Sequence, residues 1–199
     1  LHDLLFSIEP NDKNRLQDVL VQAQARYRTD MVYEGSGTAM SHAARGLTPE
    51  GYLAEMVYGL PQLTLVEGFN KNFDTCSEDI ICQIESIRDF LLVRGRLTAS
   101  FTGSDNSAAI VQNTMENWIS DMRHESIDDA SIGFTPYDDP PSEGLAGPIQ
   151  VAHCAQVIPA PHYSHPDKTA LTVGAHLVRL DYIMNEIRFR GNAYGAMFN

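Results

Sequence analysis

The sequence predicts an α+β fold, in which a mainly helical segment, residues 1–95, precedes an incomplete α/β sandwich, residues 96–199. Apolar residues recur at helical spacing through the first segment. After Arg96 the pattern alternates as in a half-buried strand, and residues 149–161 form a nearly continuous apolar run that is typical of a central strand. We therefore expect a mixed or antiparallel sheet covered by helices, in a domain truncated at its C-terminus.

The helical segment contains three recognisable helices. The first is indicated by apolar residues at helical spacing, namely Leu16, Val19, Leu20, Ala23 and Tyr27. Thr48 and Pro49 then supply a capping hydroxyl and a first-turn proline, and Pro61 is expected to end or kink the helix that they start. That second helix should bury Leu53, Met56, Val57 and Leu60.

Two further features complete this segment. Residues 33–46 are rich in glycine and other small residues, and this composition predicts a loop. A third helix is expected to open at Thr75, with Glu78 closing a capping box. Its apolar stripe would consist of Ile80, Ile81, Ile84, Ile87, Phe90 and Leu91.

The second segment reads as strand, helix, loop, strand, helix, strand. Residues 96–103 predict the opening strand, and Ser104 caps the helix that follows. After the apolar run, a long helix begins near Pro166 and ends in glycine, and from Ala193 the pattern returns to that of a strand. The buried face of the long helix should carry Val173, Leu177, Leu180, Met184 and Ile187.

Charge and composition exclude several classes of protein. The net charge is −12 with only 14 Lys and Arg residues, which argues against a nucleic-acid-binding surface and favours cationic partners such as basic peptides. No apolar run approaches the ~18 residues of a membrane span. The first residues lack a secretory signal and an initiating Met, so we expect a piece of a longer polypeptide in the bacterial cytoplasm or an organelle matrix.

Metal-binding and nucleophilic motifs are not found in the sequence. His162 and His165 are closely spaced, but neither His-Glu-x-x-His nor His-x-x-Glu-His occurs, so we assign no metal ligands. The three cysteines, Cys76, Cys82 and Cys154, contain no Cys-x-x-Cys pair. A Gly-x-Ser-x-Gly elbow is also missing. The chain by itself shows no complete catalytic constellation, and whether it belongs to an active enzyme stays open.

Three stretches nevertheless resemble one family. They are GLTPEGYLAEMVYGLPQL, RLTASFTGSD, and the run from VAHCAQVIPAPHYSHPD to EIRFRGNAYG. All are similar to the C-terminal half of the insulinase-type zinc metallopeptidases, in the presequence-protease branch (subfamily C) of peptidase family M16. The most specific match is Arg188, followed by a glycine-containing turn and Ala-Tyr-Gly.

The resemblance implies a fold and a site. Family members are clamshells of four related α/β domains of the mitochondrial-processing-peptidase type, with zinc held by His-x-x-Glu-His in the first domain. Arg188 and Tyr194 would then contact the substrate, where cationic and phenolic donors stabilise charge on the scissile carbonyl oxygen. Gly191, Asn192 and Gly195 would form the supporting turn. The family has glycine where this chain has Asn192, and asparagine tolerates glycine-like backbone angles.

The resemblance also implies a function. The chain would be a fragment of a zinc-dependent oligopeptidase that supplies chamber wall and substrate contacts but is inactive alone. Zinc would lie in the N-terminal half of the same polypeptide, which would be its partner together with peptide substrates. The unpaired sheet edge of the truncated domain would favour self-association.

A different class of function stays open. The parent could be a non-catalytic M16-like peptide-binding or partner subunit. From the residues alone, Arg188 can also be read as a cation that favours a helix C-terminus, and Tyr194 as an ordinary residue at a strand start.

Overall fold

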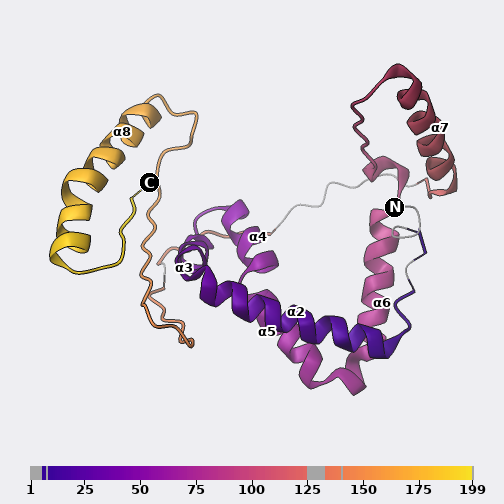
Figure 1. Ribbon diagram of the computed structural model, residues 1–199, viewed down its shortest axis with the longest axis horizontal. Coiled ribbons are helices and arrows are strands. Elements are labelled where there is room, and N and C mark those ends of the chain that lie inside the picture. The colour runs from indigo at the N-terminus through magenta and orange to yellow at the C-terminus, as the bar shows by residue number, and fades with distance from the viewer. Residues whose placement is uncertain (1–5, 8, 125–132, 140, 199) are drawn as a thin grey trace. The chain divides into compact units, whose positions relative to one another are not determined.

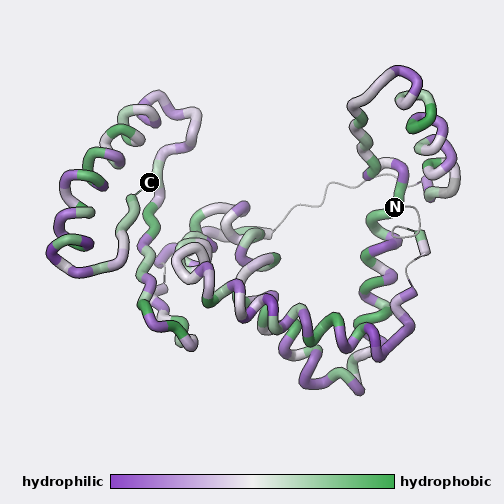
Figure 2. The backbone as a smooth tube through the Cα atoms, viewed as in Figure 1, coloured by the Kyte–Doolittle hydropathy of each residue, from purple (hydrophilic) through white to green (hydrophobic). Residues whose placement is uncertain are grey.

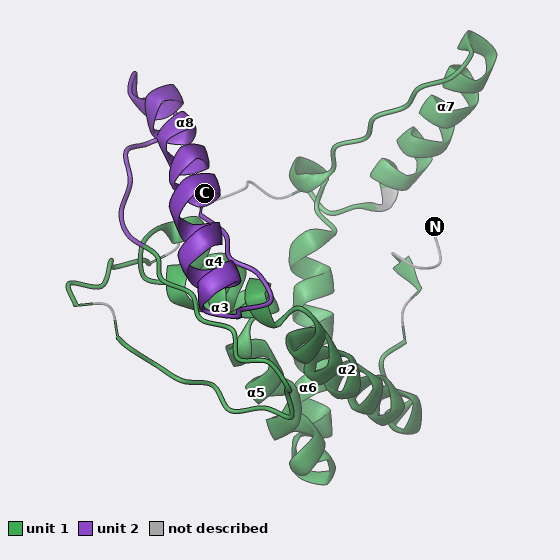
Figure 3. Ribbon diagram, turned by 60° about the vertical axis from the view of Figure 1, so that its left-hand side comes forward, with its two compact units in different colours: residues 1–157 green, residues 158–199 purple. Residues whose placement is uncertain are grey.

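The computed structural model describes residues 6–7, 9–124, 133–139 and 141–198. The chain divides into two compact units, unit 1 (Leu1–Val157) and unit 2 (Ile158–Asn199), which are coloured separately in Figure 3. Each unit is described by itself below.

Unit 1 is built from helices (Figure 1). In chain order they are α2 (Lys13–Tyr33), α3 (Gly35–Ala44), α4 (Pro49–Tyr58), α5 (Leu60–Lys71), α6 (Phe73–Leu91), the 3₁₀ turn η1 (Arg94–Arg96) and α7 (Asp105–Asp121). Helix α5 packs against α2, α4 and α6, and α3 packs against α2 and α4. The buried apolar residues lie mainly on α5 and α6, and they are Leu63, Val66, Phe73, Ile80, Ile81, Val93 and Met122.

Two of the predicted helix starts are confirmed. The Thr48 hydroxyl accepts a hydrogen bond from the Gly51 amide at 3.0 Å, and Pro49 occupies the first turn of α4. At the start of α7, the Ser104 hydroxyl accepts from the amide of Ser107. Side-chain oxygens at these positions satisfy amides that have no partner within the helix. The first predicted helix is confirmed as well, because α2 covers all of its stripe.

Other local predictions are wrong. Residues 33–46 are largely helical in α3, because Gly35 and Gly37 lie in its first turn, Gly46 follows its end, and contacts with α2 and α4 override the weak helix propensity. Helix α6 begins at Phe73, and the Thr75 hydroxyl donates to the carbonyl of Asn72 instead of capping. On α4 the buried residue is Glu55, whereas Leu53, Met56 and Val57 are exposed.

The predicted α/β sandwich is also wrong. Within the described residues there are no strands, and residues 97–103, 149–161 and 193–198 run as irregular chain. The β-type pairing found among the described residues is an isolated bridge between Val93 and Arg123. A strand needs a neighbouring strand for its backbone hydrogen bonds, and none of the three segments has one here. The domain boundary between residues 95 and 96 stays a prediction.

Unit 2 consists of α8 (Lys168–Val178), which continues into the π-helical segment η2 (Arg179–Arg190). The predicted long helix is therefore confirmed, including the glycine that follows it. Its apolar stripe is not buried: Val173, Leu177, Leu180 and Ile187 are all exposed. Figure 2 shows these apolar positions alternating with polar ones along the helix.

Candidate functional site

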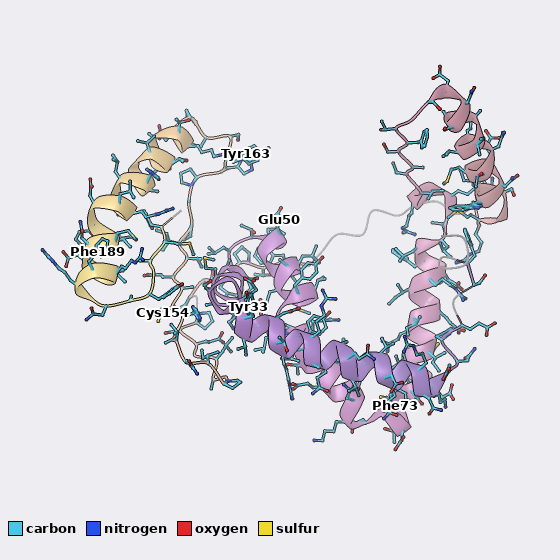
Figure 4. All side chains as sticks on the ribbon, viewed as in Figure 1. Tyr33, Glu50, Phe73, Cys154, Tyr163 and Phe189 are labelled. Atoms are coloured by element: carbon cyan, nitrogen blue, oxygen red, sulfur yellow. The ribbon has the colours of Figure 1, made fainter. Side chains whose placement is uncertain are left out.

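The end of η2 carries the residues that the family resemblance singles out. Arg188 is exposed, and its guanidinium carbon lies 5.9 Å from the centroid of the Phe189 ring. Phe189 is itself exposed and is labelled in Figure 4. Arg190 forms an ion pair with Glu186 at 2.5 Å, four residues earlier on the same helix. Two cations thus lie in the last turn, where the helix dipole favours positive charge.

The turn that follows depends on two special backbone positions. A Cβ added at Gly191 would lie 2.6 Å from the carbonyl oxygen of Ile187, so a larger residue does not fit without a shift. Asn192 has φ of 56°, in the left-handed region that asparagine tolerates better than most residues. The amide of Ala193 then donates to the Ile187 carbonyl at 3.1 Å and closes the turn. Asn192 therefore has the glycine-like backbone angle that asparagine tolerates, and its role in supporting a substrate site stays a prediction.

Tyr194 follows this turn and is 92% exposed, and Gly195 is exposed beside it. Among the described residues, no hydrogen bond joins Arg188 to Tyr194 or occupies the tyrosine hydroxyl. The two side chains come from opposite sides of one turn, and both offer donors that a bound peptide could use. Their roles toward substrate stay predictions.

Unit 1 contains a charged cluster that the sequence reasoning missed. Glu55 of α4 is 3% exposed, and its Oε1 lies 2.7 Å from Nδ1 of His42 on α3. The same oxygen accepts from the amide of Leu60 at 3.3 Å. A Cβ at Gly59 would lie 2.3 Å from the carboxylate, so the glycine between α4 and α5 leaves room for it. The buried Glu55 carboxylate therefore has one hydrogen-bond partner on α3 and another at the start of α5.

The cluster continues to Glu143, in the irregular chain that follows α7. Oε2 of Glu143 lies 2.9 Å from Nε2 of His42 and 2.5 Å from a guanidinium nitrogen of Arg45. The hydrogen bond with His42, together with the charge of Arg45, holds the pKa of Glu143 below its ordinary value. Arg45 also donates to the carbonyl of His42, and its guanidinium carbon lies 5.5 Å from the centroid of the Tyr137 ring.

An open groove runs from this cluster along α5. It encloses ≈ 670 Å³, with His42, Arg45 and Glu55 at its charged part. The remaining lining is mostly apolar and comes from α5 and the start of α6, namely Leu60, Pro61, Thr64, Leu65, Gly68, Phe69, Asn72 and Cys76. A groove with a charged part and an apolar wall can bind an amphipathic ligand.

A signal for the cluster exists in the sequence. Glu55 stands between Ala54 and Met56, and it is the one charged residue in the otherwise apolar or aromatic stretch 52–58. A carboxylate there needs a partner if that face is buried. The composition of residues 33–46 predicts a loop, and a loop does not place His42 as that partner.

The described part of the chain offers no zinc site. No group of three or more His, Cys, Asp or Glu side chains there is placed to hold a metal ion. Nδ1 of His162 instead lies 2.8 Å from the hydroxyl of Ser164, and the His165 ring lies beside Asp167. The donor set of these residues therefore does not fit a zinc ion.

Known proteins are similar to this chain over almost its whole length. The family model for the associated region of subfamily C of the M16 peptidases matches residues 1–68. A protein named "Presequence protease, mitochondrial" from Gibberella zeae is 26% identical over 190 residues, or 94% of this chain and 19% of that protein. Its namesake from Yarrowia lipolytica is 25% identical over 198 residues, or 98% of this chain and 20% of that protein. The chain fits a region of the subfamily C peptidases of family M16. The resemblance inferred from the sequence is thereby confirmed.

A relative with a different name also matches. "Protein HypA" from Clostridium perfringens is 20% identical over 189 residues, or 95% of this chain and 19% of that protein. The chain thus spans about a fifth of the length of the curated relatives that it matches. Over the described residues, no helix has the length and apolar character needed to cross a membrane.

Proposed function

We propose that this chain is a substrate-contacting region of a zinc-dependent peptidase of family M16, subfamily C. In this proposal Arg188 and Tyr194 contact the bound peptide, and the helices of unit 1 form part of the chamber wall. Zinc is held elsewhere in the polypeptide, and the 199-residue chain alone does not hydrolyse peptides. Because the Gibberella zeae and Yarrowia lipolytica relatives carry "mitochondrial" in their names, an organelle matrix is the proposed compartment.

The observation that carries this proposal is the turn between the two residues. Asn192 in the left-handed region and the bond from Ala193 to Ile187 reverse the chain directly after η2. The turn leaves Tyr194 almost fully exposed, although a tyrosine whose only role is packing is usually buried. An exposed phenol and an exposed guanidinium on the two sides of one turn suit contact with a bound peptide.

The chemistry of the two side chains is complementary. Peptide hydrolysis develops negative charge on the scissile carbonyl oxygen, and one preorganised donor contributes about 3 kcal/mol to the transition state. The phenol of Tyr194 is a neutral donor on a stiff ring. Arg188 is a permanent cation with several donors, so it can orient backbone carbonyls of the peptide as well.

The test is a tyrosine exchange in the complete polypeptide that contains this chain. Tyr194→Phe removes one hydroxyl, and we expect kcat for a peptide substrate to fall about 100-fold with KM little changed. Tyr182→Phe is the matched control, because Tyr182 is also an exposed tyrosine of unit 2, at 65%. Unchanged kcat in Tyr194→Phe would contradict the proposal, and a parent without activity would point to the non-catalytic peptide-binding alternative.

A further inference from the structure

We propose that His42 and Arg45 form a carboxylate-binding site in unit 1, and that it takes the C-terminal end of an extended peptide. In the structure this site is filled from within by the carboxylate of Glu143. The peptide would displace Glu143 and place its last side chains in the groove along α5. This site is separate from Arg188 and Tyr194, and the inference does not depend on their role.

His42 is held ready for an anion. Its side chain is only 15% exposed, and Nδ1 is fixed by the buried Glu55 carboxylate at 2.7 Å. That contact orients the ring so that Nε2 points toward Glu143. One carboxylate oxygen therefore lies against each ring nitrogen of His42, that of Glu55 at Nδ1 and that of Glu143 at Nε2.

Arg45 is held in a similar way. It follows the last turn of α3, donates to the carbonyl of His42, and has a side chain that is also 15% exposed. Its second terminal nitrogen is directed at the same oxygen of Glu143 that His42 contacts. Two fixed side-chain nitrogens, one of them on a permanently charged guanidinium, thus converge on one oxygen, and charge-assisted contacts of this kind bind carboxylates in proteins.

Glu143 behaves as an internal ligand of these two residues. It lies 101 residues from His42 in sequence, and it belongs to irregular chain in which no helix or strand fixes its position. Its side chain is 43% exposed, whereas the donors that it contacts are mostly covered. The lowered pKa of its carboxyl agrees with an anion held by the hydrogen bond with His42 and by the charge of Arg45. An exposed loop side chain can leave at lower cost than the buried residues behind it.

Charge complementarity specifies the occupant. Without Glu143, the permanently charged Arg45 would lose the carboxylate that it contacts, and Nε2 of His42 would face the vacated position. A ligand that replaces Glu143 should therefore carry one negative charge. Leu60, Leu65 and Phe69 extend from it as an apolar wall, so the ligand should carry its charge at the end of an apolar chain.

A peptide fits this groove better than an acyl chain does. The groove is open along its length, so a ligand would keep one side in water. The Thr64 hydroxyl and the Asn72 amide nitrogen line it and donate to the carbonyls of Leu60 and Gly68. The oxygen atoms of these two side chains can still accept hydrogen bonds from the amides of a peptide, which an acyl chain lacks.

The experiment measures fluorescence anisotropy of a labelled peptide, Ala-Ala-Ala-Leu-Leu, with the full chain. The probe is used with a free C-terminal carboxylate and, separately, as its amide. We expect the acid to bind at least tenfold more tightly than the amide. Glu143→Ala removes the internal competitor, whose effective concentration is on the order of mM, and should tighten binding of the acid about tenfold. Asp139→Ala, in the same irregular segment, is the matched control and should change nothing.

A second pair of variants tests the groove. A Cβ at Gly68, which lines the groove, meets no atom within 4 Å, so the Cβ of Gly68→Leu is tolerated; its side chain should occupy the groove and weaken binding of the acid at least tenfold. Gly37 is also helical and equally unobstructed but does not line the groove, so Gly37→Leu should bind as the unsubstituted chain does. Equal affinities for acid and amide, or unchanged affinity in both Glu143→Ala and Gly68→Leu, would overturn the proposal.

Discussion

The α4–α5 region of unit 1 and the α8–η2 helix of unit 2 use amphipathic sequence in different ways. In unit 1 the apolar faces of α5 and α6 meet neighbouring helices, and Leu63, Val66 and Ile80 are buried. The α8–η2 helix has an equally regular stripe, but none of its residues is buried. The difference shows that periodicity predicts a helix, whereas burial also requires a partner surface.

The two regions also hold charge differently. Glu55 is a carboxylate buried between helices, and its partners are themselves fixed. The charges at the end of η2 are exposed, and apart from the pair between Glu186 and Arg190 they face solvent. Substitutions in unit 1 should therefore change global stability, and those in unit 2 should change local order or function.

The largest effect is expected at Glu55. Glu55→Ala leaves His42 without its inner partner and opens space between α4 and α5. We expect a loss of about 3 kcal/mol in the free energy of unfolding, since breaking a buried charged pair is costly. Urea unfolding followed by circular dichroism measures it. The control is Glu50→Ala on the exposed face of α4, and an equal loss in the two variants would show that the buried cluster is not stabilising.

A smaller and local effect is expected at Asn192. Asn192→Ala puts a residue with a Cβ and no local hydrogen-bonding group at a φ of 56°. The turn should lose about 1 kcal/mol, which corresponds to roughly fivefold faster exchange of the Ala193 amide hydrogen. Asn192→Gly should preserve the protection. Identical exchange in both variants would mean that the left-handed turn is not what orders this segment.

The smallest effect is expected at the surface of the charged cluster. Because the folded state lowers the pKa of Glu143, its contribution to stability is present above the unfolded value of about 4.3 and disappears as the pH falls through the lowered pKa. Glu143→Gln should thus be less stable than the unsubstituted chain at pH 7 and equal to it in strong acid. Urea midpoints at both pH values give the comparison, and a difference that persists in acid would contradict this assignment.

The elements that could be predicted are those set by local chemistry. The starts at Thr48 and Ser104 follow from a side-chain oxygen that meets the first helical amides, which is a contact within four residues. The left-handed position of Asn192 follows equally from its own side chain. These features need no distant partner.

Apart from the helix start expected at Thr75, which failed within a single turn, the predictions that failed depended on distant partners. A strand pattern becomes a strand only beside another strand, and residues 149–161 have none among the described residues. Self-association was expected through an unpaired sheet edge, but the described residues form no sheet. Self-association stays a prediction, and it now rests on the exposed apolar stripe of α8.

The candidate sites divide in the same way. Arg188 and Tyr194 could be named because the family match and the turn are continuous in sequence. The contact of His42 with Glu55 joins two helices, and Glu143 approaches from a segment about 100 residues away. Such a cluster requires the fold to be known before its members can be recognised.

The most direct test of the account is whether position 194 touches substrate. A photoreactive benzoylphenylalanine would replace Tyr194 in the complete polypeptide, and Tyr182 in the control, and each variant would be irradiated with the labelled peptide used in the kinetic assay. The account predicts that the peptide is cross-linked from position 194 and not from position 182. Equal labelling from both positions, or labelling from position 182 alone, would contradict it.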